Sequence, residues 1–342
     1  MTDMLPRFKA AVVQSAPLPF RRNEGLEKVA EQMRQAAATG AKLALFPEAL
    51  IPGYPWGLRF GTRIGGRTPE GRRLFARYWA NSVEVPGPAT ARLGQAARDA
   101  GIFAAVGVIE RDTTYGGGTL FCTLLYFAPD GQLLGKHRKL KPTAGERFLW
   151  GEGDGSTLTV LDTEIGRVGG LICWENYMPL ARAALYAKGV QVYLAPTADA
   201  RDTWVASLRH IACEGRCFVL GCNQFVRRDA YPPEIAADED LADAPDVLCA
   251  GGSCIIGPLG DILAGPLYEQ EGILSVELDL GRLPEAKFDF DVVGHYARPD
   301  VFRLEVVENP APSVRFIPSP APESSRIEIQ QMNANPFRKS DS

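Results

Sequence analysis

Residues 166–180 read Gly-Arg-Val-Gly-Gly-Leu-Ile-Cys-Trp-Glu-Asn-Tyr-Met-Pro-Leu, and the rest of the chain is organised around this stretch. The apolar run from Val168 to Ile172 is typical of a buried strand, and it ends on Cys173. A helical pattern begins near Pro179, because proline is tolerated in the first helical turn. The sequence therefore predicts Cys173 on a tight turn between a buried strand and a helix. Backbone N–H groups at such a turn can face a developing negative charge, which suits a nucleophile.

The alternative for a lone cysteine is a packing role, because free cysteine usually behaves as a small buried hydrophobe. The residues after Cys173 favour the catalytic role. Trp174, Glu175 and Asn176 place bulk, negative charge and an amide directly after the apolar strand. A cysteine with only a packing role does not require a large aromatic, a charged and an amide side chain directly after it.

The composition is that of an ordinary globular protein. The chain has 342 residues, of which 46% are hydrophobic and 23% charged, and its formal net charge is −4. A net negative chain does not fit a general nucleic-acid surface. No apolar stretch approaches the roughly 20 residues that a membrane span needs. We therefore expect neither nucleic acid nor a membrane as a partner.

Cysteine and histidine usage indicates the compartment and bears on metal binding. The seven cysteines form no Cys-x-x-Cys pair, and the first residues lack the features of a signal peptide. These features predict reduced thiols and a cytoplasmic location. His137, His210 and His295 are far apart in sequence, so no metal site is expected.

Strands and helices alternate along the chain with glycine and proline between them, which predicts an α/β fold. We expect helices at 22–39, 89–100, 179–188 and 204–216, and strands at 8–14, 43–46, 102–109, 120–127, 158–161, 168–172, 190–195, 218–223, 252–256, 260–264 and 272–278.

Two segments depart from this alternation. Residues 228–247 contain seven acidic residues and three prolines, and we interpret them as an exposed insertion. From residue 308 to 342 the chain is rich in proline and serine and loses periodicity. We predict a single catalytic domain over 1–307 and a tail over 308–342 that is disordered or ordered on a partner subunit.

Three segments supply a nucleophile, an acid and an amine. Glu48 follows the apolar strand 43–46, and Lys139 lies in the basic stretch 136–141, which we interpret as a loop. Because strand carboxyl ends meet at one edge of an α/β sheet, we expect both residues beside Cys173. A carboxylate can accept the thiol proton and an ammonium can stabilise developing charge. His137 is the nearest histidine in sequence, which argues against a papain-like Cys–His pair.

The sequence resembles the nitrilase (carbon–nitrogen hydrolase) superfamily over about residues 7–305. The matching segments are Phe46-Pro47-Glu48, Arg138-Lys139-Leu140-Lys141-Pro142-Thr143, Glu146-Arg147 and Cys173-Trp174-Glu175. Further segments are similar to those of the true nitrilase branch: Trp150-Gly151-x-Gly153-Asp154-Gly155-Ser156 and Gly294-His295-Tyr296-x-Arg298-Pro299. The resemblance to plant and related bacterial nitrilases rests on Ala195-Pro196-Thr197-Ala198-Asp199, Trp204 and Glu214-Gly215-x-Cys217-Phe218-Val219-Leu220.

The resemblance implies a fold, a reaction and roles for particular residues. The implied fold is a single-domain α-β-β-α sandwich. The implied reaction converts an organic nitrile to the carboxylic acid and ammonia through a thioimidate and a thioester on Cys173. Glu48 would be the base, Lys139 would stabilise the tetrahedral intermediates with the backbone N–H of Trp174, and Glu146 would orient Lys139. The resemblance implies no metal or organic cofactor, and it implies a homo-oligomer, either a dimer or a larger assembly such as a spiral filament.

The substrate-binding residues and the substrate are less defined. Tyr54, Trp174, Thr197 and Trp204 are candidates for the pocket, although the aromatic residues could equally be core. The nitrile could be aryl-aliphatic, aliphatic or similar to β-cyanoalanine.

Two alternatives to a nitrilase remain. The first is an amidase or carbamoyl amidohydrolase of the same superfamily, and Trp174 with Glu175 favours the nitrile branch. The second is a non-catalytic oligomeric scaffold, which would have no need for the full catalytic set.

Overall fold

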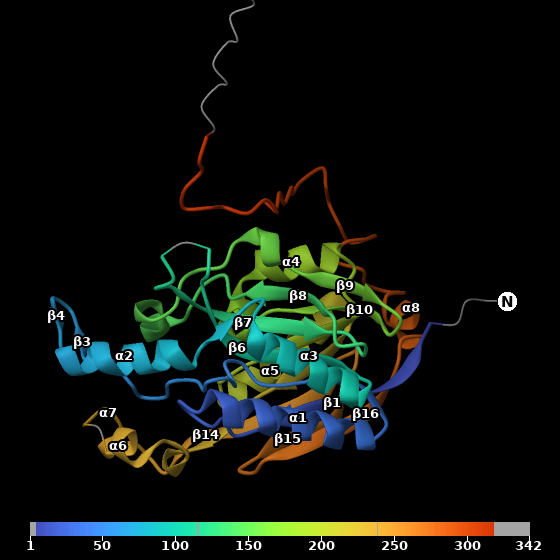
Figure 1. Ribbon diagram of the computed structural model, residues 1–342. Helices are drawn as coiled ribbons and strands as arrows, with labels where there is room; N and C mark the ends of the chain where they lie inside the picture. Colours follow the sequence, from blue (N-terminus) through green and yellow to red (C-terminus); the bar gives the residue numbers. More distant parts are fainter. Residues whose placement is uncertain (1–4, 115, 238, 318–342) are drawn as a thin grey trace, which may run out of the picture. The chain divides into compact units, whose positions relative to one another are not determined.

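Two mixed β-sheets face each other at the centre of residues 1–310, which form one unit of the computed structural model (Figure 1). The structure describes residues 5–114, 116–237 and 239–317. Residues 311–342 form a second unit, of which 318–342 lie outside the described residues. The tail predicted over 308–342 therefore stays a prediction.

The first sheet is built from strands of the N-terminal half of the chain and one late strand, β16. Its strand order is β16 (Gly272–Asp279), β1 (Arg7–Gln14), β2 (Ala41–Leu45), β6 (Phe103–Arg111), β7 (Leu120–Phe127) and β8 (Leu133–Arg138), and β5 (Val83–Glu84) also pairs with β6. Strands β1, β2 and β6 are parallel. Strand β7 is antiparallel to β6 and to β8, so β8 runs in the same direction as β6.

The second sheet contains the strand before Cys173. Its order is β13 (Phe225–Arg227), β14 (Val247–Ile256), β12 (Phe218–Cys222), β11 (Val192–Pro196), β10 (Gly166–Gly170) and β9 (Val160–Thr163), and β15 (Ile262–Tyr268) pairs with β14. Strands β10, β11 and β12 are parallel, and β9 and β10 form the predicted hairpin.

Helices cover the outer face of each sheet. Helices α1 (Arg22–Ala38) and α3 (Pro88–Ala100) share one apolar cluster with β1, β2 and β6, while α4 (Pro179–Ala187) and α5 (Asp202–Gly215) share another with β11 and β12. In α1 the buried residues Leu26, Val29 and Met33 recur at helical spacing and face the sheet. A third cluster fills the space between the sheets. The predicted α-β-β-α sandwich is confirmed.

The remaining elements belong to neither of the two large sheets nor to the four covering helices. They are β3 (Thr62–Arg63), β4 (Gly66–Arg67), α2 (Pro69–Asn81), α6 (Pro233–Ala236), α7 (Glu239–Ala242), α8 (Arg282–Ala286) and the 3-10 turns Ala144–Phe148, Gly155–Thr157, Cys173–Tyr177 and Arg228–Ala230. None of the helices in the described part of the chain combines the length and apolarity of a transmembrane segment.

The interpretation of the basic stretch 136–141 as a loop is wrong for its first residues. Lys136, His137 and Arg138 belong to β8, and the two outer residues pair with the buried carboxylate of Glu110 on β6. Their charge is neutralised inside the protein, so the segment can be a strand. The pairing partner is 26 residues away for Lys136 and 28 for Arg138, which local sequence cannot reveal.

The interpretation of residues 228–247 as an exposed insertion is also wrong in part. Tyr231, Ile235 and Leu241 are buried in the central apolar cluster. The hydroxyl of Tyr231 donates to the carbonyl of Tyr54 at 2.6 Å. The segment therefore packs beside the residues that follow Glu48.

One glycine lets the Glu48 segment approach the first sheet. After β2 the chain runs along β6, where a Cβ atom on Gly107 would lie 2.1 Å from the carbonyl oxygen of Pro47 and 2.8 Å from Cα of Glu48. Both contacts are to backbone, so only a glycine fits here without moving the chain.

We predict that Gly107→Ala destabilises the protein by about 1–3 kcal/mol, because overpacking forces the Pro47–Glu48 backbone away from β6. Urea unfolding would measure the change. Gly118→Ala is a matched control, because nothing lies within 4 Å of that added Cβ. Equal stability of the two variants would contradict the prediction.

Candidate active site

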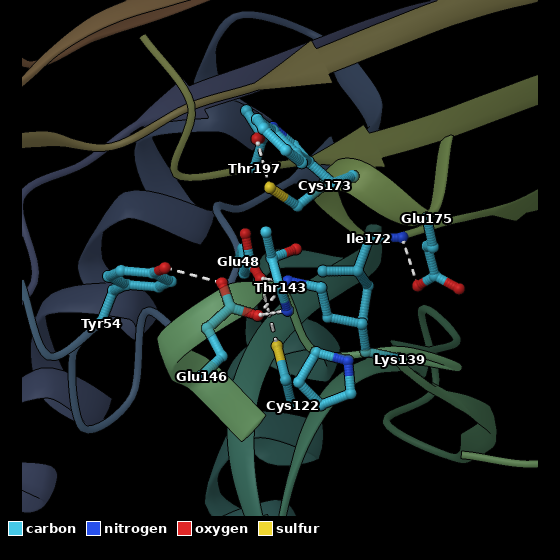
Figure 2. A network of polar contacts seen from close by, with 12 residues as sticks. Glu48, Tyr54, Cys122, Lys139, Thr143, Glu146, Ile172, Cys173, Glu175 and Thr197 are labelled. Carbon is cyan, nitrogen blue, oxygen red and sulfur yellow. Dashed lines mark hydrogen bonds and ion pairs between the residues drawn. The ribbon is translucent and has the colours of Figure 1, made fainter. Parts of the chain in front are cut away.

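The predicted catalytic residues follow the carboxyl ends of strands from both sheets (Figure 2). Glu48 is the third residue after β2, and Cys173 is the third after β10. Lys139 directly follows β8, and Thr197 directly follows β11. All four residues are buried. The two sheets thus bring these side chains together at one end of the sandwich.

The Lys139 ammonium bridges two carboxylates. Its Nζ atom lies 2.6 Å from Oε1 of Glu48 and 2.8 Å from Oε2 of Glu146. Burial by itself would lower the pKa of Lys139, but the carboxylates of Glu48 and Glu146 outweigh it and hold the pKa well above its ordinary value. The ammonium therefore stays charged, and it neutralises only part of the negative charge around it.

Glu146 has both carboxylate oxygens occupied. Its Oε2 also accepts from the backbone N–H of Thr143 at 2.7 Å, and its Oε1 accepts from the hydroxyl of Tyr54 at 2.6 Å. The 3-10 turn Ala144–Phe148 places the Glu146 carboxylate against the backbone N–H of Thr143, the residue before the turn. This carboxylate is fixed in place and can hold Lys139 in one orientation.

Glu48 has one occupied and one free carboxylate oxygen. Oε1 accepts from Lys139 and from the Cys122 thiol, whose sulfur is 3.5 Å away. Among the described residues, Oε2 has no hydrogen-bond partner. Burial raises the pKa of Glu48, and the Glu146 charge adds to this effect, although Lys139 opposes it. A buried carboxylate with a raised pKa and a free oxygen can act as a general base.

Cys173 lies on a strained turn. Its φ angle is 52°, in the left-handed region that side chains other than glycine rarely adopt. The side-chain amide of Asn176 supports the turn by donating to the carbonyls of Leu171 and Cys173 at 2.9 and 2.8 Å. Figure 2 shows the Cys173 sulfur next to Thr197, whose hydroxyl donates to it at 3.2 Å. Burial raises the pKa of the Cys173 thiol and the Glu48 charge raises it further, so the thiol is protonated at rest.

A cavity of about 470 Å³ opens onto Cys173. Its walls are mainly aromatic and small apolar side chains, with a few polar groups among them. They come from Tyr54, Trp56, Thr143, Glu146, Cys173, Trp174, Ala198, Asp199, Ala200, Arg201, Val247, Leu248 and Ala250.

The predicted substrate-binding residues fall into three groups. Tyr54 and Trp174 line the cavity, and Thr197 contacts the Cys173 sulfur. Trp204 is not part of the wall, because it is 1% exposed and packs in the apolar cluster beneath α5. Trp204 shares its buried face with Leu208 and Ile211, which recur at helical spacing, so the apolar pattern of 204–216 favoured the core alternative.

Several cavity residues were missed by the sequence analysis. Asp199 accepts from the indole N–H of Trp174 at 2.8 Å and from Arg201 at 2.8 and 2.6 Å. The Arg201 guanidinium lies 4.4 Å from the centre of the Trp174 ring. The position of Asp199 directly beyond a buried strand was a usable signal. Leu248 in the cavity wall gave none, and neither did Cys122, which lies behind Glu48, because their roles depend on contacts with distant segments.

Within the described residues, no group of three or more histidine, cysteine, aspartate and glutamate side chains could hold a metal ion. The predicted absence of a cofactor stays a prediction.

Comparison with known proteins gives a consistent set of relatives. The family model described as carbon-nitrogen hydrolase matches residues 9–288. The chain is 55% identical to an aliphatic nitrilase of Sinorhizobium fredii, over 91% of this chain and 99% of that one. It is 51% identical to the bifunctional nitrilase/nitrile hydratase NIT4B of Nicotiana tabacum (91% and 89%) and 49% identical to nitrilase 3 of Arabidopsis thaliana (92% and 91%).

Solved structures support the fold. An amidase of the nitrilase superfamily from Nesterenkonia AN1 superposes with a TM-score of 0.61 at 22% identity, covering 82% of this chain and 95% of that one. Nit3 of Saccharomyces cerevisiae superposes with a TM-score of 0.65 at 21% identity, covering 86% and 97%. At this identity the likeness concerns the fold alone.

We predict that Tyr54→Phe lowers the free energy of unfolding by about 1–3 kcal/mol, because the variant leaves Oε1 of Glu146 without its donor. Urea unfolding measures the change, and Tyr177→Phe is the control, since Tyr177 is exposed. A loss no larger than that of the control would show that the Tyr54–Glu146 hydrogen bond contributes nothing to stability.

Proposed function

Because the chain belongs to the carbon–nitrogen hydrolase family, we propose that it is a nitrilase, which converts an organic nitrile and two waters to the carboxylic acid and ammonia. The identity of about half of all residues to several nitrilases supports this reaction. The observation that carries the chemistry is the buried set of one thiol, two carboxylates and the ammonium that links them.

In the first half of the proposed mechanism, Sγ of Cys173 attacks the nitrile carbon. The thiol proton passes to Glu48 and then to the nitrile nitrogen, so a C–S bond and an N–H bond form and a thioimidate results. The raised pKa of the thiol means that no thiolate is stored at rest. The base must therefore act during the attack, and Oε2 of Glu48, which has no hydrogen-bond partner within the described part of the chain, supports that role.

In the second half, Glu48 takes a proton from water as its hydroxyl adds to the thioimidate carbon, and this proton passes to the nitrogen. The hydroxyl of the tetrahedral intermediate then gives its proton through Glu48 to the nitrogen, so the C–N bond breaks, ammonia leaves and a thioester remains. A second water adds to the thioester carbon and the C–S bond breaks, so the acid is released and the water's proton returns through Glu48 to Sγ of Cys173. Lys139, with the backbone N–H of Trp174, would stabilise each tetrahedral intermediate. Glu146 would keep the Lys139 ammonium aimed at the reacting carbon, and its two occupied oxygens support this positioning role.

The tetrahedral intermediate from the first water has a second possible fate. If it expels the thiolate rather than ammonia, the product is the amide. Relatives that are named bifunctional nitrilase/nitrile hydratase make this branch worth measuring alongside the acid.

The cavity supports a nitrile with an apolar side chain. Trp56, Trp174, Val247 and Leu248 give the wall its apolar character, and Ala198 and Ala250 leave room near Cys173. Both an aliphatic and an aryl-aliphatic substituent match this chemistry. The charged Asp199–Arg201 pair gives the cavity a polar side as well.

We also propose that the protein works in the cytoplasm as a homo-oligomer. The seven cysteines are free, which suits a reducing compartment. Exposed apolar side chains, among them Leu180, Phe302 and Val307, would gain from burial against a second copy. Sedimentation of the full chain would measure the assembly.

We predict that the protein releases ammonia from nitriles and that Cys173→Ala reduces turnover on the order of 10⁶-fold or to the detection limit, as expected when a nucleophile is lost. The panel would contain phenylacetonitrile, mandelonitrile, hydrocinnamonitrile, benzonitrile, β-cyanoalanine and a dinitrile, each with its amide. Turnover of amides alone would make the protein an amidase, and inactivity of folded wild-type protein on both series would favour a scaffold.

We predict that kcat/KM falls as the pH is lowered, and that the fall begins at a pH above the ordinary glutamate pKa of about 4.3. Glu48 must be ionised to accept the thiol proton, and burial raises its pKa, so the base is lost early as the pH falls. A pH–rate profile with circular dichroism at each pH would test this. A rate that stays constant down to the ordinary glutamate pKa would contradict it.

A further inference from the structure

A second buried ion pair lies directly behind the catalytic residues. His137 and Glu175 are both fully buried, and the His137 Nε2 atom is 2.9 Å from Oε2 and 3.0 Å from Oε1 of Glu175. His137 precedes Lys139 by two residues, and Glu175 follows Cys173 by two. The mechanism above does not use either side chain.

The Glu175 carboxylate also binds the backbone next to both catalytic residues. Its Oε2 accepts from the N–H of Ile172 at 2.8 Å, and its Oε1 accepts from the N–H of Leu140 at 3.3 Å. Ile172 immediately precedes Cys173, and Leu140 immediately follows Lys139. Figure 2 shows the bond from Ile172 to Glu175. One carboxylate therefore holds the chain on both sides of the site.

The contacts of His137 favour its imidazolium form. Its Nδ1 atom lies 2.8 Å from the carbonyl oxygen of Thr157, which can only accept, so Nδ1 carries a hydrogen. Its Nε2 atom faces two carboxylate oxygens and must also carry one. Burial lowers the pKa of His137, but the Glu175 charge and the Thr157 carbonyl outweigh this and raise it. The two side chains thus form a buried pair in which each polar hydrogen of the imidazolium form faces an acceptor.

The topology explains why such a link matters. Lys139 follows a strand of the first sheet, and Cys173 follows a strand of the second. Strands β8 and β10 share no β-ladder, so backbone pairing within the sheets does not fix the distance between the two residues. The turn at Cys173 is also strained and needs support.

We propose, on the basis of the proposed function, that the His137–Glu175 pair is a positioning device that sets the Cys173 sulfur against the Lys139 ammonium across the two sheets. Neither residue touches the substrate. Because misplacing reacting groups by about 1 Å can reduce a rate about 10²-fold, the pair should act on kcat rather than on binding.

The test compares Glu175→Gln and His137→Gln with Glu110→Gln. Glu110 is the matched control, because it is a buried carboxylate that pairs with Lys136 and Arg138 of the same strand β8. Side chains alternate along a strand, so these two residues point to the opposite face from His137. The readouts are kcat and KM for a nitrile, and the rate of Cys173 alkylation by iodoacetamide, at a temperature where circular dichroism shows each variant folded.

We expect Glu175→Gln to lower kcat about 10²-fold with little change in KM, and to slow alkylation of Cys173 about tenfold or more. His137→Gln should follow in the same direction, which keeps the test open should one variant fail to fold. Glu110→Gln should lower the Tm but leave kcat within about twofold, since it does not contact the site.

Two results would overturn the proposal. One is a kcat and an alkylation rate within about threefold of wild type in the folded Glu175 or His137 variant. The other is an equal loss of kcat in Glu110→Gln, which would show general destabilisation. Failure of the proposed function would give a different result, namely a wild-type protein that is inactive on nitriles. In that case the alkylation rates of Cys173 would still test whether the His137–Glu175 pair positions the sulfur.

Discussion

The site depends on one fully buried ammonium. Lys139 can be charged inside the protein only because Glu48 and Glu146 both lie within hydrogen-bond distance. Removing one partner of a buried pair leaves an uncompensated charge and typically destabilises a protein by about 3–5 kcal/mol. Lys139 and Glu146 are seven positions apart after β8, whereas Glu48 is 91 positions before Lys139, so the fold must bring two distant segments together around this charge. Burial raises the pKa of both the Glu48 carboxyl and the Cys173 thiol, and the neighbouring carboxylate of Glu146 or Glu48 adds to the effect on each.

The segments that meet at Lys139 share a backbone feature. Ala49, Ala144 and Cys173 all adopt positive φ angles, of 47°, 44° and 52°. Each lies in or next to a turn that carries a site residue, and such conformations persist only where the surroundings impose them. Here the surroundings are the sheet at Gly107, the amide of Asn176 and the carboxylate of Glu175. The rigid sandwich thus supports strained turns at its edge, where the chemistry is placed.

The sequence predicted the family, the sandwich and most strands and helices, because apolar periodicity and ordered motifs are local signals. It failed where the decisive contact is remote. The charged residues Lys136 to Arg138 of β8 were interpreted as a loop, because nothing nearby in the sequence shows that Glu110 pairs with Lys136 and Arg138. The contacts of Glu175 with His137 and of Cys122 with Glu48 join residues 38 and 74 positions apart, which no pattern in a single sequence encodes.

The central claim is that Cys173 carries the covalent intermediate. The most direct measurement is mass spectrometry of protein quenched in acid during turnover of a nitrile, followed by peptide mapping. The account predicts one adduct, with the mass of the nitrile or of its acyl group, on the peptide that contains Cys173. An adduct on another residue, or rapid turnover with unmodified protein at every quench time, would contradict it.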